Sequence, residues 1–470
     1  MVEIAEKLRA ILGTGGLLED PGLIAPYLVD FRRLFHGASP FVARPATTAQ
    51  VSSVVQLCAQ SRIALVPQGG NTGYCGGATP DGSGTQIILS LQRMNRIRAI
   101  DPAGFNLTAE AGCTLLQVQQ AADNAQRLFP LSLGSEGTCQ IGGNVSTNAG
   151  GTAVLRYGVM RELVLGLEVV LPDGRVLDQL RSLRKDNTGY DLKQLFIGAE
   201  GTLGVVTAAC LKLFSRPFGH ATAFIGVQDL NAAVALLSLL RQRMGDSVVA
   251  FEAMPRLAIE LAVKHIAGVR DPLQGPHPWY VLAEIALHDG PALQTEQFGG
   301  LLNQLLEEGA IRDAVLASSD TQRLAMWHLR ENVPAAQTRE GASIKHDISL
   351  PIAAIPDFVS AAGSAALDLA PGARMLAYGH LGDGNLHFNF SQGADQSATE
   401  FLTHTDAIKR AVHDRVAALG GSISAEHGIG QLKAEELRRY EDPVTWELMR
   451  TLKRTLDPHN LMNPGKVLAS

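Results

Sequence analysis

The sequence predicts an α+β protein with at least two domains, and three observations support this. The chain has 470 residues, whereas one domain usually takes about 100–200. Hydrophobic residues make up 46% of the chain and charged residues 18%, which suits large cores and argues against disorder. Glycine-rich loops separate short strands before about Arg216, and longer strands alternate with helices after it.

Periodicity predicts the elements of the first part of the chain. Val51, Val54, Val55 and Cys58 repeat at helical spacing, so we expect a helix over 51–60 with Thr47 or Thr48 as its N-cap. A further helix is predicted over 115–126, and a hairpin over 166–178 turns at Pro172-Asp173-Gly174. Strands are predicted over 63–66, 85–91, 95–101 and 106–112.

In the second part of the chain, longer strands alternate with helices. We expect strands over 221–227, 248–254, 279–287 and 314–318, and helices over 230–244, 297–309 and 320–332. A last helical segment over 435–458 stops at Pro458, and Pro464 follows it.

Composition excludes several partners. The net charge of -6 provides no basic surface for nucleic acid or an anionic membrane. No run of eighteen apolar residues is present to span a bilayer, and the first residues lack a secretory or transit composition, so we expect a cytoplasmic protein without a transmembrane segment. The five cysteines include no CxxC pair, which excludes an iron-sulfur cluster or zinc ribbon held in cis and predicts buried, reduced thiols.

Three glycine-rich stretches are the strongest functional signal in the first part. They are PQGGNTGYCGG, LGSEGTCQIGGNVSTNAGGT and IGAEGTLGVV. Glycines let backbone N-H groups converge on a diphosphate without obstruction by side chains. Neither GxGxxG nor GxxxxGK[ST] occurs, so a bound dinucleotide would need a fold other than the Rossmann or P-loop type.

Together with YGHLGDGNLHFN, SAEHGIG and the terminal NPGK, these stretches resemble a known family over essentially the whole chain. They are similar to the PCMH-type FAD-binding domain of the vanillyl-alcohol oxidase superfamily, and within it to D-2-hydroxyacid dehydrogenases typified by the D-2-hydroxyglutarate and D-lactate enzymes. The resemblance implies a two-subdomain FAD domain over 1–217 and an α+β substrate domain over 218–425. A C-terminal segment, 426–470, would return to the FAD domain.

The resemblance also implies the cofactor-binding residues. FAD would be dissociable, because relatives that attach it covalently often have histidine where this chain has Asn71. The FAD-binding positions are Pro67, Gly69, Gly70, Asn71, Thr72, Gly73, Gly134, Gly137, Thr138, Gly142, Gly143, Asn144, Thr147, Asn148, Gly151, Gly158, Glu200, Gly201, Gly204 and Val206.

The stretch YGHLGDGNLHFN predicts a pair of metal-binding histidines. Counted outward from a two-residue turn at Asp383-Gly384, His380 faces His387, and opposed residues of a hairpin point to one face. Asn389 shares that face. A metal site of this kind commonly takes three protein ligands, so a carboxylate should lie nearby.

The family resemblance assigns the remaining roles. His380, His387 and Glu426 would bind a divalent cation, zinc or manganese, and His427 would act as the catalytic base. Asn389 would contact a substrate oxygen, and Arg330 and Lys345 would bind substrate carboxylate, which favours a dicarboxylate. A hydroxyl residue found nearby in some hydroxyglutarate enzymes is replaced by Pro334, so D-lactate and D-malate stay open.

The implied reaction is oxidation of a D-2-hydroxy acid, with D-2-hydroxyglutarate as the first choice, by hydride transfer to flavin N5. Electrons would pass to an external acceptor such as electron-transfer flavoprotein or a quinone, and a homodimer is an open expectation. Two alternatives remain: an FAD-binding subunit of a glycolate-oxidase-like complex, and an oxidase or NADPH-dependent reductase of the same superfamily.

Overall fold

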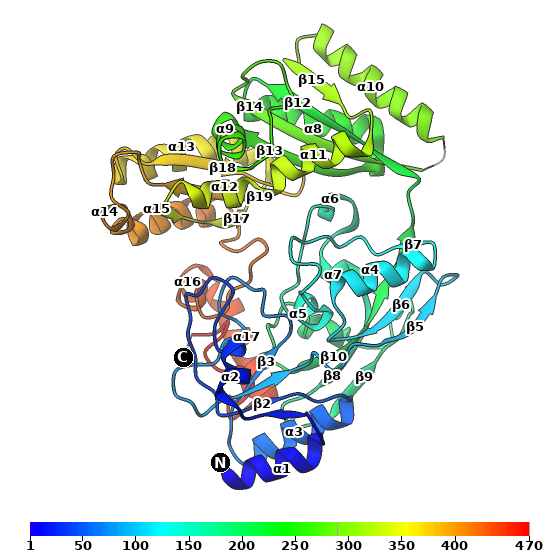
Figure 1. Cartoon of the computed structure of the whole chain (residues 1–470), viewed down its shortest axis with the longest axis vertical. Helices are drawn as coiled ribbons and strands as arrows, with labels where there is room; N and C mark the ends of the chain where they lie inside the picture. The colour runs from blue at the N-terminus through cyan, green and yellow to red at the C-terminus, as the bar shows by residue number, and fades with distance from the viewer. Residues whose placement is uncertain (289, 470) are drawn as a thin grey trace. The chain divides into compact units, whose positions relative to one another are not determined.

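The computed structural model describes residues 1–288 and 290–469, which form two compact units (Figure 1). The first unit contains Met1–Gly151, Gly158–Arg216 and the chain from Glu426 onward. The second contains Thr152–Tyr157 and Pro217–Ala425. The change of sequence character near Arg216 therefore coincides with a unit boundary, whereas nothing in the sequence marked the transfer of Thr152–Tyr157 to the second unit.

A small sheet and the helices α1, α2 and α3 begin the first unit. The sheet order is β1-β2-β4-β3, with β2, β4 and β3 parallel. The Thr47 side chain accepts a hydrogen bond from Gln50 N and caps α3, so the predicted helix and its cap are confirmed. Apolar residues of α1 and α3 pack on this sheet in one core. The elements are α1 (Val2–Leu12), β1 (Leu17–Leu18), α2 (Pro21–Ile24), β2 (Val42–Ala43), α3 (Thr48–Gln60), β3 (Leu65–Gln68) and β4 (Ile87–Ser90).

A five-stranded antiparallel sheet follows in this unit, in the order β5-β6-β10-β8-β9. The predicted hairpin is confirmed, since Leu171 N donates to Arg175 O across a turn in which Gly174 has φ 87°. The strands of this sheet are β5 (Ile97–Asp101), β6 (Asn106–Glu110), β8 (Val164–Val170), β9 (Val176–Gln179) and β10 (Val205–Lys212). A separate antiparallel pair consists of β7 (Arg127–Leu128) and β11 (Phe214–Ser215), and the helices are α4 (Leu115–Asn124), α5 (Ile141–Ser146) and α7 (Met160–Leu163).

The C-terminal segment belongs to the first unit and contains two helices, α16 (Ala434–Tyr440) and α17 (Pro443–Leu456), where the sequence suggested one helical stretch. The division falls at Asp442, whose carboxylate accepts from Val444 N and Thr445 N, because Pro443 suits a first helical turn. Beyond α17, the tail runs parallel to β3: Leu65 N donates to Leu461 O, and Asn463 N donates to Leu65 O.

The second unit is centred on an antiparallel sheet in the order β13-β14-β12-β15. The elements are α6 (Val154–Tyr157), β12 (Gly219–Val227), α8 (Leu230–Met244), β13 (Val248–Pro255), α9 (Arg256–His265), β14 (Trp279–Leu287), α10 (Pro291–Glu307), β15 (Asp313–Leu316), α11 (Asp320–Glu331) and α12 (Val333–Arg339). The four predicted strands and the helices predicted over 230–244 and 320–332 are confirmed, whereas the helix predicted over 297–309 begins six residues earlier, at Pro291, and α6, α9 and α12 were not predicted.

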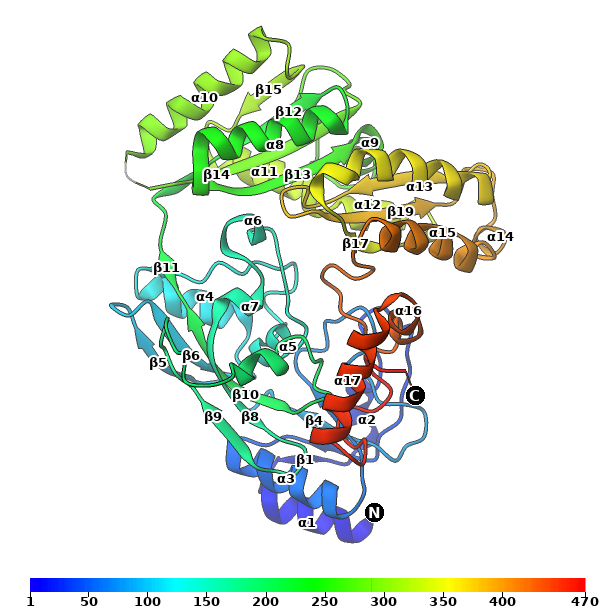
Figure 2. The ribbon, with the colours of Figure 1, turned by 180° about the vertical axis from the view of Figure 1, so that it is seen from behind.

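A second small sheet of this unit carries the histidine stretch. Strand β19 pairs with β16, β17 and β18, and helices α13 and α15 pack together beside it (Figure 2). Phe358 of α13 packs against Phe388 of β19 with the rings tilted by 57° and their centroids 5.0 Å apart. The elements are β16 (Ser343–Ile344), β17 (Asp347–Ser349), α13 (Ile355–Leu369), β18 (Arg374–Tyr378), β19 (Asn385–Ser391), α14 (Ala398–Leu402) and α15 (Thr405–Ala418).

Within the described residues, the window Ile352–Leu369, which includes α13, has the length and mean hydropathy (1.3) of a membrane-spanning helix. Ile355, Phe358, Val359, Ala362 and Ala366 bury one side of this helix in the unit. A core helix meets the same length and composition criterion, so the window alone is weak evidence for a membrane span.

Candidate active site

Glycine-rich segments of the first unit surround a pocket with about 880 Å³ of empty space, including its open mouth. Its wall comes from three stretches, 67–78, 139–147 and 200–206, together with Leu91 and His427. Three segments far apart in the sequence therefore converge on one cavity.

Close backbone contacts explain why glycine is needed at the first loop. A Cβ atom on Gly70 would collide with the carbonyl oxygen of Thr138, and one on Gly69 would lie 3.5 Å from Gly143 N. The first two glycine segments thus touch through their backbones. Gly73 and Gly143 instead face open space, where a Cβ would meet nothing within 4 Å.

Most of the predicted cofactor residues line this pocket: Pro67, Gly69, Gly70, Asn71, Thr72, Gly73, Gly142, Gly143, Asn144, Thr147, Glu200, Gly201, Gly204 and Val206. Gly134, Gly137, Thr138, Asn148, Gly151 and Gly158 do not. Asn148 has a local role, since its Oδ1 accepts from Arg161 N at the start of α7. Gly158 has φ 76° and turns the chain before α7.

Sequence reasoning missed Gln140, which also lines the pocket. Only 9% of its surface is exposed, and its Oε1 has no hydrogen-bond partner within the described residues. A buried acceptor without a donor is costly, and a ligand with hydroxyl or amide donors can satisfy it. In the sequence, the only indication of this role was that Gln140 is a polar residue between the apolar Cys139 and Ile141 in the glycine-rich stretch CQIGG.

His427 lines the same pocket and is half-buried. Its ring contacts Tyr74 edge to face, with centroids 4.6 Å apart. The residues that follow it are fixed by Glu200, whose carboxylate accepts from Ile429 N at 2.7 Å and Gly430 N at 2.9 Å. Burial raises the pKa of the Glu200 carboxyl, while these two N-H groups lower it.

The predicted two-residue turn between the other two histidines is wrong. The β18–β19 register pairs Tyr378 with His387, so His380 lies on a loop after β18. The loop leaves β19 because Gly379 pairs with a different strand: Gly379 N donates to Ala253 O, and Ala253 N donates to Gly379 O. The ladder therefore ends before His380 can oppose His387.

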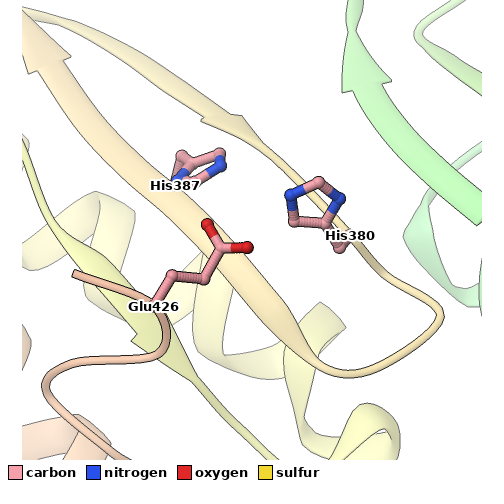
Figure 3. A group of neighbouring side chains, drawn as sticks. All are labelled: His380, His387 and Glu426. Carbon is pink, nitrogen blue, oxygen red and sulfur yellow. The ribbon is translucent and has the colours of Figure 1, made fainter. Parts of the chain in front are cut away.

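The two imidazoles nevertheless meet, with ring centroids 5.7 Å apart. Figure 3 shows the Glu426 carboxylate pointing toward both rings. The possible ligand atoms of His380, His387 and Glu426 all lie within 4.8 Å of one another. Glu426 directly follows Ala425, whose N donates to Asp347 O on the strand beside His387. Two imidazoles and a carboxylate at this spacing form a donor set that suits a divalent ion such as zinc or manganese.

The structure places the predicted substrate-binding residues in the second unit. Arg330 Nε donates to Glu252 Oε2 at 2.7 Å, and Lys345 Nζ lies 3.5 Å from Thr338 Oγ1. Asn389 Nδ2 donates to Gln337 Oε1, and its Oδ1 accepts from His346 N. The Asn389 amide is thus held from both ends within the protein.

Asp347 was not singled out from the sequence. It opposes His387 in the β17–β19 register, with its Oδ1 4.0 Å from His387 Nδ1. Its position two residues after Lys345, in IKHDIS, was the only sequence signal. Asp347 therefore adds a second carboxylate beside the histidine pair.

Family models match both parts of the chain. The model described as an FAD binding domain matches residues 39–179, and that described as the C-terminal domain of FAD linked oxidases matches residues 217–467. The mitochondrial D-2-hydroxyglutarate dehydrogenase of Bos taurus is 42% identical over 455 residues, covering 97% of this chain and 81% of that protein. The chain belongs to the family of FAD-linked D-2-hydroxyacid dehydrogenases.

Other relatives extend the comparison of this FAD-linked dehydrogenase. The D-2-hydroxyglutarate--pyruvate transhydrogenase of Saccharomyces cerevisiae is 34% identical, covering 98% of this chain and 93% of that protein. Among solved structures, p-cresol methylhydroxylase with substrate bound has a TM-score of 0.76 at 18% identity, covering 100% of this chain and 97% of that one. At that identity the likeness shows the fold alone, and the expected PCMH-type FAD-binding fold is confirmed.

The pocket of the first unit fits the FAD of this dehydrogenase family. Its backbone-lined glycine segments suit a diphosphate, and the unpartnered Gln140 oxygen suits a hydroxylated or amide-bearing ligand. Asn71 occupies the first loop with φ 54° and donates through Nδ2 to Val29 O. Its side chain is therefore engaged with the protein backbone.

Proposed function

We propose that the enzyme oxidises D-2-hydroxyglutarate to its 2-oxo acid with the help of a divalent cation. The observation that carries this choice is the setting of Arg330. Its Nε is held by Glu252, while its two terminal nitrogens make no hydrogen bond within the described residues. Because His380 bonds to the same carboxylate, a cationic fork lies close to the histidine pair. Such a fork suits a second substrate carboxylate.

The protein residues divide the work of the reaction. Oxidation removes the hydroxyl proton and a hydride equivalent from the α-carbon, and His427 is the base for the proton. Arg330 and Lys345 bind the substrate carboxylate groups, and Asn389, on the same strand face as His387, contacts a substrate oxygen. Bound FAD supplies the two-electron acceptor. A zinc or manganese ion held by His380, His387 and Glu426 would lower the pKa of the substrate hydroxyl.

Electrons then need an external acceptor. The sequence has no CxxC pair and no nicotinamide fingerprint, which favours a partner such as electron-transfer flavoprotein or a quinone. We also propose a cytoplasmic location and a homodimer. Several relatives, in contrast, are named as mitochondrial proteins. One relative, from Schizosaccharomyces pombe, is named a putative D-lactate dehydrogenase, and Pro334 supplies no side-chain donor for a longer substrate. D-lactate is therefore the second candidate.

Anaerobic bleaching of the flavin by a panel of D- and L-2-hydroxy acids tests the proposal. We expect D-2-hydroxyglutarate to give the highest rate per substrate concentration, with D-lactate slower and L-acids inactive. A higher rate with D-lactate would replace the proposed substrate. Subsequent exposure to air separates a dehydrogenase from an oxidase, because fast reoxidation by oxygen would contradict an external acceptor. Dye reduction by the purified chain alone would argue against a subunit that works only within a complex.

A further inference from the structure

We propose that Glu252 is the positioning residue of the histidine pair, holding His380 in the tautomer that can bind a cation. The inference rests on the metal part of the proposed function and extends it to a residue outside the ligand set. Glu252 lies within β13 and is completely buried. It is far from the histidine stretch in the sequence.

Two hydrogen bonds define the role of this carboxylate. Glu252 Oε1 lies 2.6 Å from His380 Nδ1, and Glu252 Oε2 accepts from Arg330 Nε at 2.7 Å. An ionised carboxylate can only accept, so the hydrogen lies on His380 Nδ1, and the neutral ring keeps its lone pair at Nε2. Figure 3 shows one ring nitrogen of His380 on the side of His387 and Glu426. That nitrogen is then free of hydrogen and able to bind a cation.

The backbone fixes this contact from both sides of Glu252. Ala253 exchanges two hydrogen bonds with Gly379, and Gly382 N donates to Phe251 O at 3.1 Å. A side chain at Gly382 would press on Leu155 and Phe251. The loop that carries His380 is therefore attached to β13 immediately before and after Glu252, and the contact does not depend on a mobile side chain alone.

Arg330 explains why a carboxylate can work at this buried position. A lone buried carboxylate is costly, whereas one paired with a guanidinium and further hydrogen-bonded is tolerated. Glutamine cannot replace it, because His380 and Arg330 both donate and an amide has only one oxygen to accept. Its NH2 group would either face Arg330 or drive His380 into the other tautomer. Carboxylate partners of this kind also make a ligating imidazole more basic.

Zinc affinity of the FAD-loaded, metal-free enzyme is the test, measured by competition with a chromophoric chelator. Loss of such a partner typically weakens metal binding by about 10–100-fold, and we expect this for Glu252→Gln. Glu252→Asp keeps the charge that balances Arg330 but is one methylene shorter. It should keep the fold better and still bind zinc more weakly than the parent. Circular dichroism and FAD content report folding independently of zinc.

Glu284→Gln is the matched control. Glu284 lies on the neighbouring strand β14, is also buried, and accepts from Arg323 Nε at 2.8 Å, but its other hydrogen-bond partners are Thr222 and Trp327. It should lower stability without changing zinc affinity. Zinc binding within twofold of the parent in folded Glu252→Gln, or an equal loss in Glu284→Gln, would overturn the inference.

His387→Ala separates this inference from the proposed metal site. A large zinc loss in His387→Ala with no loss in Glu252→Gln would contradict the role of Glu252 alone. No zinc loss in His387→Ala would contradict the metal site itself, and the role of Glu252 with it.

Discussion

Glu200 and Ile429 are joined by a 2.7 Å hydrogen bond between a buried carboxylate and a backbone N-H, across 229 residues of sequence. The next N-H, that of Gly430, donates to the other carboxylate oxygen. A side chain on Gly428 would press on Glu200 Oε1, and Gly428 itself has φ 72°. The backbone that follows His427 therefore has one defined position, set by a residue of the pocket wall.

Replacing Glu200 by glutamine should lower kcat by about one to two orders of magnitude, because small misplacements of a catalytic group have effects of that size. The amide can accept from only one of the two N-H groups, so the backbone after His427 shifts. Steady-state kinetics with flavin content measured in parallel checks this. Glu168→Gln, a buried glutamate that bonds to Arg98 and Thr48 instead, should keep kcat near the parental value. Equal losses in both variants would indicate a general folding effect.

His427→Ala should reduce the rate of flavin reduction by about 10²–10⁴-fold while FAD and metal contents stay unchanged, since loss of a general base has that effect. Rapid mixing of substrate with the oxidised enzyme under anaerobic conditions measures the chemical step directly. His459→Ala, at an exposed histidine after α17, serves as the control. Parental rates in folded, FAD-loaded His427→Ala would exclude this residue as the base.

The sequence identified many residues of the site correctly but did not predict their geometry. The glycine stretches and the two histidines were recognisable because backbone-lined loops and paired imidazoles have local signatures. The hairpin register failed because Gly379 pairs with Ala253, a contact across 126 residues that local counting cannot include. Glu252 had only a faint signal, a single acid within the apolar strand VVAFEAM. Its importance depends on partners brought by folding.

Helices, strands and turns could be predicted where the residues within the element itself determine its conformation. The cap at Thr47, the turn at Gly174 and the long strands of the second unit follow from residues within each element. The assignment of Thr152–Tyr157 to the second unit does not, because α6 packs on β13, about one hundred residues further along the chain. The unit to which a short segment belongs depends on tertiary packing, which local sequence does not reveal.

FAD should be released completely when the enzyme is denatured. Asn71 offers no ring nitrogen for attachment at the first loop, and burial raises the pKa of the Cys139 thiol in the pocket wall, which disfavours the nucleophilic thiolate. Acid precipitation should leave a colourless pellet and all flavin absorbance in the supernatant. A yellow pellet that survives repeated washing would show covalent attachment and contradict the expectation.

Arg330→Lys should discriminate between dicarboxylate and monocarboxylate substrates. Lysine keeps a positive charge near Glu252 but lacks the planar fork that holds a carboxylate through two bonds. We expect kcat/KM for D-2-hydroxyglutarate to fall at least about tenfold, roughly the effect of one lost charged hydrogen bond, with D-lactate affected about threefold or less. The Glu284→Gln enzyme provides a control for disturbance of the unit. Equal losses for both substrates would show that Arg330 does not distinguish a dicarboxylate from a monocarboxylate.

Lys466 should make the stability of the first unit depend on pH. It is 3% exposed, and its Nζ has Pro464 O as its hydrogen-bond partner at 3.3 Å. Burial lowers the pKa of this ammonium group to about 8 from 10.5, while Asp81 raises it. Between these two values the unfolded chain binds more protons than the folded one, so this lysine makes the free energy of unfolding rise with pH over that window. Below about pH 8 the buried charge costs stability in full.

Lys466→Met should therefore be more stable than the parent at pH 7, by about 1–3 kcal/mol, and the difference should shrink toward pH 10.5. Urea unfolding of both proteins across this range measures the difference, with Lys185→Met as a control at an exposed lysine that should show none. A constant difference at every pH would assign the effect to packing, and a less stable variant at pH 7 would show that the charge has a stabilising partner.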